Sequence, residues 1–248
     1  MQPVPSRFLI RLARKCLNHP NVPLAKGDAL LDLSSEFTIA SLCGLDGQEE
    51  FAELQICWNA QGLGFQATIT GKKQHPEGDN TRPRSSDGIT IWIDTRDSRS
   101  SHRATRYCHQ FHFLASGAGP DREDPCFVQS KIHRALQDAP FCNPSEIMFR
   151  CTNEPSGYFM EAFLPSQALA GYDSEECPRL GVCIQVHDRE LGDQIYDSTL
   201  DFPFSEDPSL WSQLILVHPD RDEKPAKKKV GKSSSRKADK PSKKELES

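Results

Sequence analysis

The chain has 248 residues, of which 36% are hydrophobic, and it carries a formal net charge of −5. This length favours a single domain with appendages. The last 31 residues hold 11 Lys or Arg and 6 Asp or Glu, so the 217 residues before them carry a net charge of −10. An acidic body argues against a folded nucleic-acid-binding surface, which needs clustered positive charge.

The cysteines indicate a reducing environment. Nine cysteines are scattered along the chain without a C-x-x-C pair. An oxidising compartment would be expected to pair them as disulfides. The N-terminus has no apolar stretch of signal-peptide length, and no apolar run of about 18 residues occurs anywhere. We therefore expect a cytoplasmic protein without a transmembrane segment.

In chain order, residues 1–29 are predicted to be an N-terminal arm, with Phe8–Leu17 either a short helix or an extended segment. From residue 30 to residue 217, strand signals recur between Gly, Pro, Asn and Asp residues. The predicted strands are Leu30–Leu33, Ala52–Trp58, Leu63–Thr70, Gly88–Asp94, Thr105–Leu114, Ile147–Thr152, Tyr158–Leu164, Leu180–His187 and Leu210–Val217.

Turns and insertions separate these strands. Asn59–Gly62 is predicted to turn a hairpin, and Gly71–Ser86 is rich in Gly, Pro and charge, which predicts a loop. Val128–Ala139 spaces its apolar residues at helical intervals, which predicts a short helix. The tail, residues 218–248, is Lys-rich with almost no apolar residue and is predicted to be disordered.

The stretch Gly88–Asp94 shows the strand pattern most clearly. Its isoleucines Ile89, Ile91 and Ile93 alternate with Thr90, Trp92 and Asp94, so the isoleucines should face a core and Trp92 the opposite side. We predict an all-β fold, a two-sheet antiparallel β-sandwich of jelly-roll-like form over residues 30–217, with one short helix insertion and a disordered C-terminal tail.

The outward positions of the predicted strands carry amide, hydroxyl, imidazole and indole groups. Such mixtures suit a saccharide, because an aromatic ring covers its C–H face while amides meet its hydroxyls. The alternative is an ordinary solvent side with Trp92 covered by a loop. The proposed ligand-binding residues are Trp92, Gln66, Thr90, Gln110, His112 and Arg150.

The order of these elements resembles the family-nine carbohydrate-binding modules and their DOMON-like relatives. The resemblance rests on the hairpin with Trp58, the S-D-G-I opening at Ser86–Ile89, and the E-x-x-L-P closure at Glu161–Pro165, and it covers about Leu30–Val217. It implies a β-sandwich that binds saccharide as an accessory in carbohydrate catabolism, often with structural calcium. The aromatic residue and the Glu that sugar-binding members place near the strand opening are Pro83-Arg84 and Thr90 here.

A transition-metal site is a second interpretation of the same region. Its candidate ligands are His102, Cys108, His109, His112, Asp94 and Asp97. On a regular strand His109 and His112 point to opposite faces and cannot share one ion, so His109 is expected to be a core histidine.

Carboxylates offer two further hypotheses. Asp94 and Glu161 could pair for glycoside hydrolysis, although Asp94 more simply accepts backbone N–H groups in a turn and Glu161 anchors a neighbouring backbone or Arg. Calcium implied by the resemblance could draw on the carboxylates of Asp87, Asp94, Asp97, Asp173 or Asp188.

The sequence thus favours a noncatalytic module that binds a saccharide. One alternative is a macromolecular interaction module that recruits an anionic partner through its basic tail. Another is a metal-assisted hydrolase that uses the region from Asp94 to His112. No nucleophile or nucleotide-binding motif singles out a catalytic residue.

Overall fold

A computed structural model describes residues 12–47, 49–196 and 202–218 of the chain. These ranges contain strands and short 3-10 helices but no α-helix. The strands are β1 (Ala13–Asn18), β2 (Thr38–Ile39), β3 (Ala52–Asn59), β4 (Gly62–Thr70), β5 (Gly88–Asp94), β6 (Cys108–Ala118), β7 (Asp124–Ser130), β8 (Met148–Glu154), β9 (Gly157–Pro165), β10 (Arg179–Asp188), β11 (Gly192–Ile195) and β12 (Ser212–Val217). No helix in the described ranges is long and apolar enough to cross a membrane.

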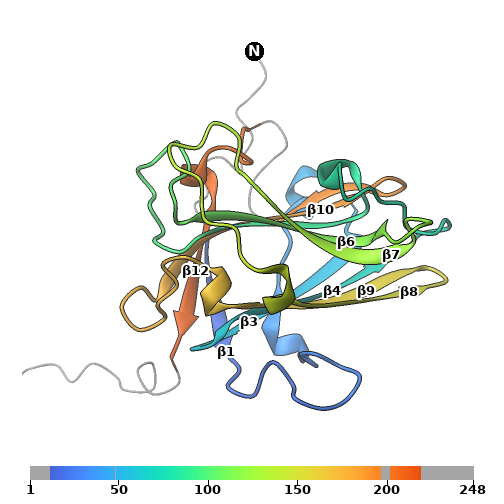
Figure 1. Ribbon diagram of the computed structural model, residues 1–248, viewed down its shortest axis with the longest axis horizontal. Helices are drawn as coiled ribbons and strands as arrows, with labels where there is room; N and C mark the ends of the chain where they lie inside the picture. The colour runs from blue at the N-terminus through green and yellow to red at the C-terminus, as the bar shows by residue number, and fades with distance from the viewer. Residues whose placement is uncertain (1–11, 48, 197–201, 219–248) are drawn as a thin grey trace, which may run out of the picture.

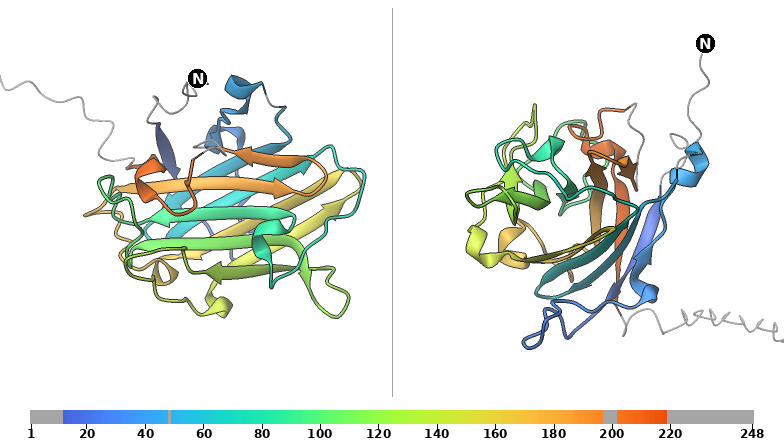
Figure 2. Two further views of the ribbon diagram at one scale, coloured as in Figure 1. Left: turned by 90° about the horizontal axis from the view of Figure 1, so that it is seen from above. Right: turned by 90° about the vertical axis from the view of Figure 1, so that its right-hand side faces the viewer.

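The strands form one continuous sheet rather than two separate ones. Its order is β7-β6-β5-β10-β12-β1-β3-β4-β9-β8, with β11 on β10 and β2 on β3. The sheet folds over on itself, so that β8 approaches β6 and β7 and the shape is nearly that of a barrel (Figures 1 and 2). All pairs are antiparallel except those of β1, which runs parallel to both β12 and β3 and joins the two halves.

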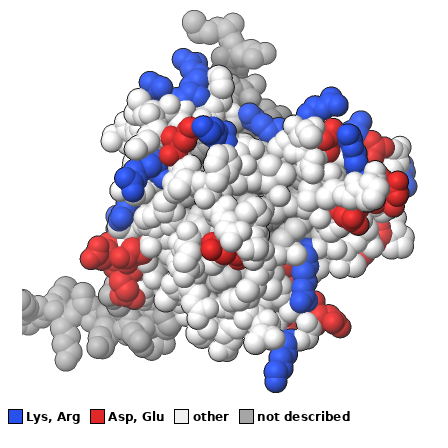
Figure 3. Space-filling model, viewed as in Figure 1, with Lys and Arg blue, Asp and Glu red and all other residues white. Residues whose placement is uncertain are grey.

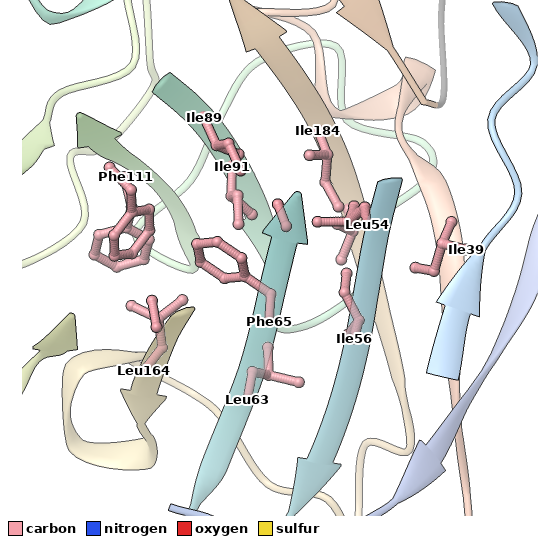
Figure 4. Close-up of a cluster of buried hydrophobic side chains, with 14 of the residues drawn as sticks. Ile39, Leu54, Ile56, Leu63, Phe65, Ile89, Ile91, Phe111, Leu164 and Ile184 are labelled. Carbon is pink, nitrogen blue, oxygen red and sulfur yellow. The ribbon is translucent and has the colours of Figure 1, made fainter. Parts of the chain in front are cut away.

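The main core lies between the two facing halves. Ile89 and Ile91 of β5 and Phe111 of β6 point toward Phe65 of β4 and Leu164 of β9 (Figure 4). The burial of these aliphatic and aromatic side chains, which come from the inner faces of both halves, supplies most of the favourable free energy of folding. The predicted alternation is confirmed, because all three isoleucines of β5 belong to this core.

Two smaller clusters cover the outer faces of the sheet. The first, over β5 and β10, contains Trp92, Cys183 and Phe204. The second lies over β3, β4 and β9, where residues 19–34 cross the sheet as a strap and pack Leu31 and Leu33 against Phe163. Loops therefore cover much of the outward face of each half, so these faces are largely not exposed to solvent.

Most predicted strands are confirmed to within a few residues, and Gly88–Asp94 matches β5 residue for residue. The hairpin at Asn59–Gly62 joins β3 to β4 in register. The two-sheet arrangement is not what the structure shows, since β1 bridges the halves into one sheet. β1 lies within the predicted N-terminal arm, so that part of the arm is an integral strand.

Two local predictions are wrong. Val128–Ala139 is not a helix: Val128 pairs with His112 in the β6–β7 ladder, and Leu136 is 62% exposed, whereas an amphipathic helix would bury it. Leu30–Leu33 is not a strand, because its backbone N–H groups bond to side chains of the sheet beneath it. The Lys-rich tail from residue 219 onward lies outside the described residues.

Candidate functional site

The six proposed ligand-binding residues lie on two different faces of the molecule. Thr90, Trp92, Gln110 and His112 share the outer face of β5 and β6, where Thr90 pairs with His112 and Trp92 with Gln110. The other two occupy the outer face of the opposite half, on β4 and β8. The main core separates these faces, so one ligand cannot contact all six residues.

Trp92 faces away from the main core, as predicted, but its exposed fraction is 0%. Its ring packs edge-on against Phe204 at 5.5 Å, and Cys183 and Ile132 complete its surroundings. The covered arrangement, which was the alternative interpretation of the sequence, is the one observed. In this arrangement the indole cannot reach a sugar ring.

Gln66 and Arg150 bond to the strap. The Gln66 amide exchanges two hydrogen bonds with the backbone of Leu33, at 2.9 and 3.0 Å. The exposed Arg150 guanidinium donates to the carbonyls of Asp28 and Gly27. Both side chains use their polar groups to hold the strap on the sheet.

Thr90, Gln110 and His112 form a connected network. The Gln110 amide nitrogen donates to His112 Nε2 at 3.1 Å, which makes Nδ1 the protonated ring nitrogen. That N–H bonds to Thr90 Oγ1 at 2.8 Å. Burial and the charge of Arg84 lower the pKa of His112 to about 4, so the imidazole is neutral at physiological pH. The network is uncharged and fixed in orientation.

We expect the free energy of unfolding to fall as the pH is lowered from about 6.5, the ordinary pKa of histidine, to about 4. Burial lowers the pKa values of both His109 and His112 to about 4. In this window the unfolded chain binds protons that the folded chain does not, which favours unfolding. Urea denaturation at several pH values measures the slope, which should be shallower in His112→Gln and unchanged in the exposed-site control His75→Gln. An equal slope in His112→Gln would contradict the assignment.

An open cleft of about 480 Å³ lies beside this network. The 3-10 helix η4 (Pro83–Ser85) forms one wall, and the end of β7 with the turn after it forms the other. The nearly buried Gln110, 3% exposed, contributes to the lining. The residues that line the cleft are Arg82, Pro83, Arg84, Ser85, Gln110, Ser130, Lys131 and His133.

The lining of this cleft has only basic charges, whereas the two signs are interspersed over the face seen in Figure 3. A larger cleft of about 660 Å³ on the other side of Arg82 differs in this respect. There Arg122 pairs with Asp79 at 2.9 Å and Arg189 pairs with Glu77. Acidic residues of its own lining neutralise these arginines, whereas the 480 Å³ cleft has no acidic residue in its lining, and we take the 480 Å³ cleft as the candidate site.

The carboxylates proposed for hydrolysis do not meet. Asp94 accepts the backbone N–H groups of Arg96 and Ser98 in the turn after β5, as the simpler interpretation predicted. Glu161 accepts the backbone N–H groups of Leu30 and Leu31 in the strap. The two side chains lie on opposite outer faces of the folded sheet, so they cannot act as an acid and base on one bond.

The predicted metal ligands also do not converge. His109 is buried on the core side of β6, where its ring stacks on Phe111, and His112 lies on the other side, as predicted. His102 bonds to Asp207 at 3.1 Å rather than to Asp94 or Asp97. Within the described part of the chain, no group of three His, Cys, Asp or Glu side chains is arranged to hold a metal ion.

Two of the five carboxylates named for calcium, Asp87 and Asp188, do not fit a bound calcium ion. Asp87 and Asp188 do approach each other, but the ammonium group of Lys72 lies between them, at 3.0 Å from Asp87 and 2.8 Å from Asp188. Glu190 is a third carboxylate at 4.0 Å. The chain therefore supplies its own cation at this point, and no cation-binding role is derived for these carboxylates.

The sequence alone did not point to Lys72 or to most residues of the cleft. Arg82, Arg84, Lys131 and His133 lie in segments that read as a loop and as a helix. Ser130 pairs with Gln110 in the β6–β7 ladder, but it lies in the segment that the sequence predicted to be a helix. No local signal marks Lys72, since its partners are 15 and 116 residues away.

Comparisons with known proteins give a likeness in structure alone. No protein-family model matches the chain, and no curated protein matches it in sequence. A family 9 carbohydrate-binding module from Caldicellulosiruptor kristjanssonii, solved with cellotriose, is 12% identical with a TM-score of 0.55 over 86% of this chain and 98% of its own. A module of the same family and organism, solved with glucose, is 12% identical with a TM-score of 0.52 over 82% and 96% of the two chains. The chain thus has the fold of the family 9 carbohydrate-binding modules.

Proposed function

We propose that this protein is a noncatalytic saccharide-binding module that takes its ligand in the 480 Å³ cleft beside η4. The observation that carries the proposal is the fold, which matches nearly the whole length of two modules solved with cellotriose and with glucose. A saccharide site needs side chains that hydrogen-bond to sugar hydroxyls. The cleft provides the amide of Gln110, which is fixed by its bond to His112, and the hydroxyls of Ser85 and Ser130.

The local chemistry agrees with binding rather than catalysis. The acidic side chains that a hydrolase would need, Asp94 and Glu161, are occupied with backbone N–H groups on opposite faces. His112, which bonds to the lining residue Gln110, is a neutral hydrogen-bonding partner. Of the six residues predicted to bind a ligand, Gln110 is the one that lines the cleft.

We expect Gln110→Ala to weaken saccharide binding about tenfold, because the lost amide contributes about 1 kcal/mol or more per hydrogen bond. A glycan panel first identifies the ligand, and isothermal titration then measures affinity. Gln167→Ala, at an exposed position in the 3-10 helix after β9, is the matched control and should bind normally. Thermal melting verifies that both variants are folded. A folded wild-type protein that binds no member of a broad panel at millimolar concentration would overturn the proposed function.

Tryptophan fluorescence is a poor readout for this site. Trp58, Trp92 and Trp211 are all buried, and none lines the cleft. Titration calorimetry, or NMR of the Gln110 side-chain amide, reports on the cleft directly.

A further inference from the structure

Resting on the proposed function, we infer that the saccharide bound in the cleft beside η4 is anionic, with its carboxylate or sulfate group held by Arg84. The inference starts from the sign of the charges. Four of the eight lining residues are Arg, Lys or His, and none is Asp or Glu. An acidic protein that gathers only basic side chains around one concave site lowers the free energy of a negatively charged ligand there.

Arg84 is the basic residue with the least competition. In the cleft lining, Arg82 lies 3.6 Å from Asp79, Lys131 bonds to Asp138 at 2.6 Å, and His133 bonds to Glu206 at 2.9 Å. Among the ion pairs of the described residues, none involves Arg84. Its exposed guanidinium therefore keeps its planar set of donors for a ligand, and that set matches a carboxylate or a sulfate in a two-bond geometry.

The position of Arg84 is set by rigid elements. It is the central residue of η4, whose C-terminal end leads through Ser86 into β5. Ser86 Oγ donates to the Arg82 carbonyl at 3.0 Å and accepts the Asp79 N–H at 2.8 Å, which fixes η4 against the loop before it. Arg84 and Gln110 line the same cleft, and Gln110 is the member of the Thr90–His112–Gln110 network that reaches it. The cleft therefore presents a cation and an uncharged amide to one ligand.

This pairing of groups determines the ligand class. A neutral sugar would hydrogen-bond to Gln110 and the serines, and the Arg84 guanidinium would remain hydrated. A uronate or a sulfated sugar uses both, with its acidic group on Arg84 and neighbouring hydroxyls on Gln110 and Ser130. The paired cations Arg82, Lys131 and His133 add a weaker, salt-sensitive attraction, because their own side chains are largely exposed to solvent.

The test compares two anionic glycans with a neutral one. Oligogalacturonate, its methyl ester and a sulfated galacto-oligosaccharide are titrated calorimetrically at 50 and 300 mM NaCl. We expect one of the two anionic ligands to bind at least about tenfold more tightly than the methyl ester, and its affinity to fall several-fold at the higher salt. The preferred anion distinguishes carboxylate from sulfate.

Variants then assign the effect to Arg84. Arg84→Gln should reduce the preference for the anion about tenfold or more, and Arg84→Lys should restore only part of it, since an ammonium cannot make the two parallel bonds. Lys15→Gln, at an exposed position of β1, is the matched control for loss of one positive charge and should bind like the wild type.

The outcomes separate the two proposals. If neutral and anionic glycans bind equally and Arg84→Gln binds like the wild type, the anionic class is overturned while the saccharide-binding function stands. If the anion binds but Arg84→Gln has no effect, the assignment to this cleft is overturned. If no glycan of any charge binds the folded protein, the proposed function itself is overturned.

Discussion

Replacing Lys72 by Met should lower the free energy of unfolding by about 3–5 kcal/mol, the cost of breaking a buried ion pair by removing one partner. The Lys72 side chain is 2% exposed, and its ammonium contacts Asp87 and Asp188, which are equally buried. Methionine preserves most of the stem but leaves two carboxylates facing each other without a cation.

The carboxylates cannot simply turn away to reach water. Asp87 also accepts the backbone N–H groups of Glu77 and Arg189, and Asp188 accepts those of Glu190 and Leu191. The cluster therefore ties the base of the Gly71–Ser86 loop to the β10–β11 turn. Losing Lys72 should loosen both segments together, and hydrogen exchange of their amides would show it.

Urea denaturation followed by circular dichroism measures the effect. Lys73→Met is the matched control, because Lys73 is the exposed neighbour and its loss should change stability by less than about 0.5 kcal/mol. The double variant Lys72→Met with Asp188→Asn should recover part of the loss, since it removes one of the unpaired charges. A Lys72→Met protein as stable as the Lys73→Met control would show that the ion cluster contributes nothing to stability.

The same cluster predicts how pH and metal ions act on the wild type. Burial by itself would lower the pKa of Lys72, but hydrogen bonds and charges from Asp188 and Asp87 outweigh it and raise the pKa above the ordinary value. The stabilisation is therefore complete below the unfolded-state pKa, about 10.4, and is lost as the pH rises through the folded-state pKa.

Calcium chloride or EDTA should leave the melting temperature unchanged, because an ammonium already fills the position between the carboxylates.

The second large effect is expected at Glu161. Glu161→Gln should cost about 2–4 kcal/mol, because bonds from N–H groups to a charged acceptor are among the stronger ones and an amide replaces one acceptor oxygen with a donor. The carboxylate, 3% exposed, accepts the N–H of Leu31 at 2.9 Å and of Leu30 at 3.0 Å. These bonds hold the strap on the outer face of β4 and β9.

The local readout distinguishes strap release from general destabilisation. In Glu161→Gln, the amides of Leu30 and Leu31 should exchange with solvent much faster, and proteolysis should cut first within residues 19–34. Glu154→Gln, an exposed position on the neighbouring β8, is the control and should behave like the wild type. Unchanged protection of the two strap amides in Glu161→Gln would contradict this role.

The local sequence predicts which residues of the candidate site share one face of the sheet, but it does not predict which of them are covered by loops. Thr90, Gln110 and His112 could be placed on one face, because alternation along β5 and β6 fixes which side chains point the same way. The alternation cannot say what lies above that face. Loop residues such as Phe204 cover Trp92 but leave Gln110 at a cleft, and that difference depends on segments about 100 residues away.

By itself, the sequence determined the all-β class, most strand positions and the inward orientation of Ile89, Ile91 and Ile93, because a period of two in hydrophobicity is a local property of a strand. It did not determine that β1 joins the halves into one folded-over sheet, that Lys72 neutralises Asp87 and Asp188, or that Arg84 stands beside Gln110. These features come from contacts between residues far apart in the chain, whose register is set only when the whole sheet closes around its core.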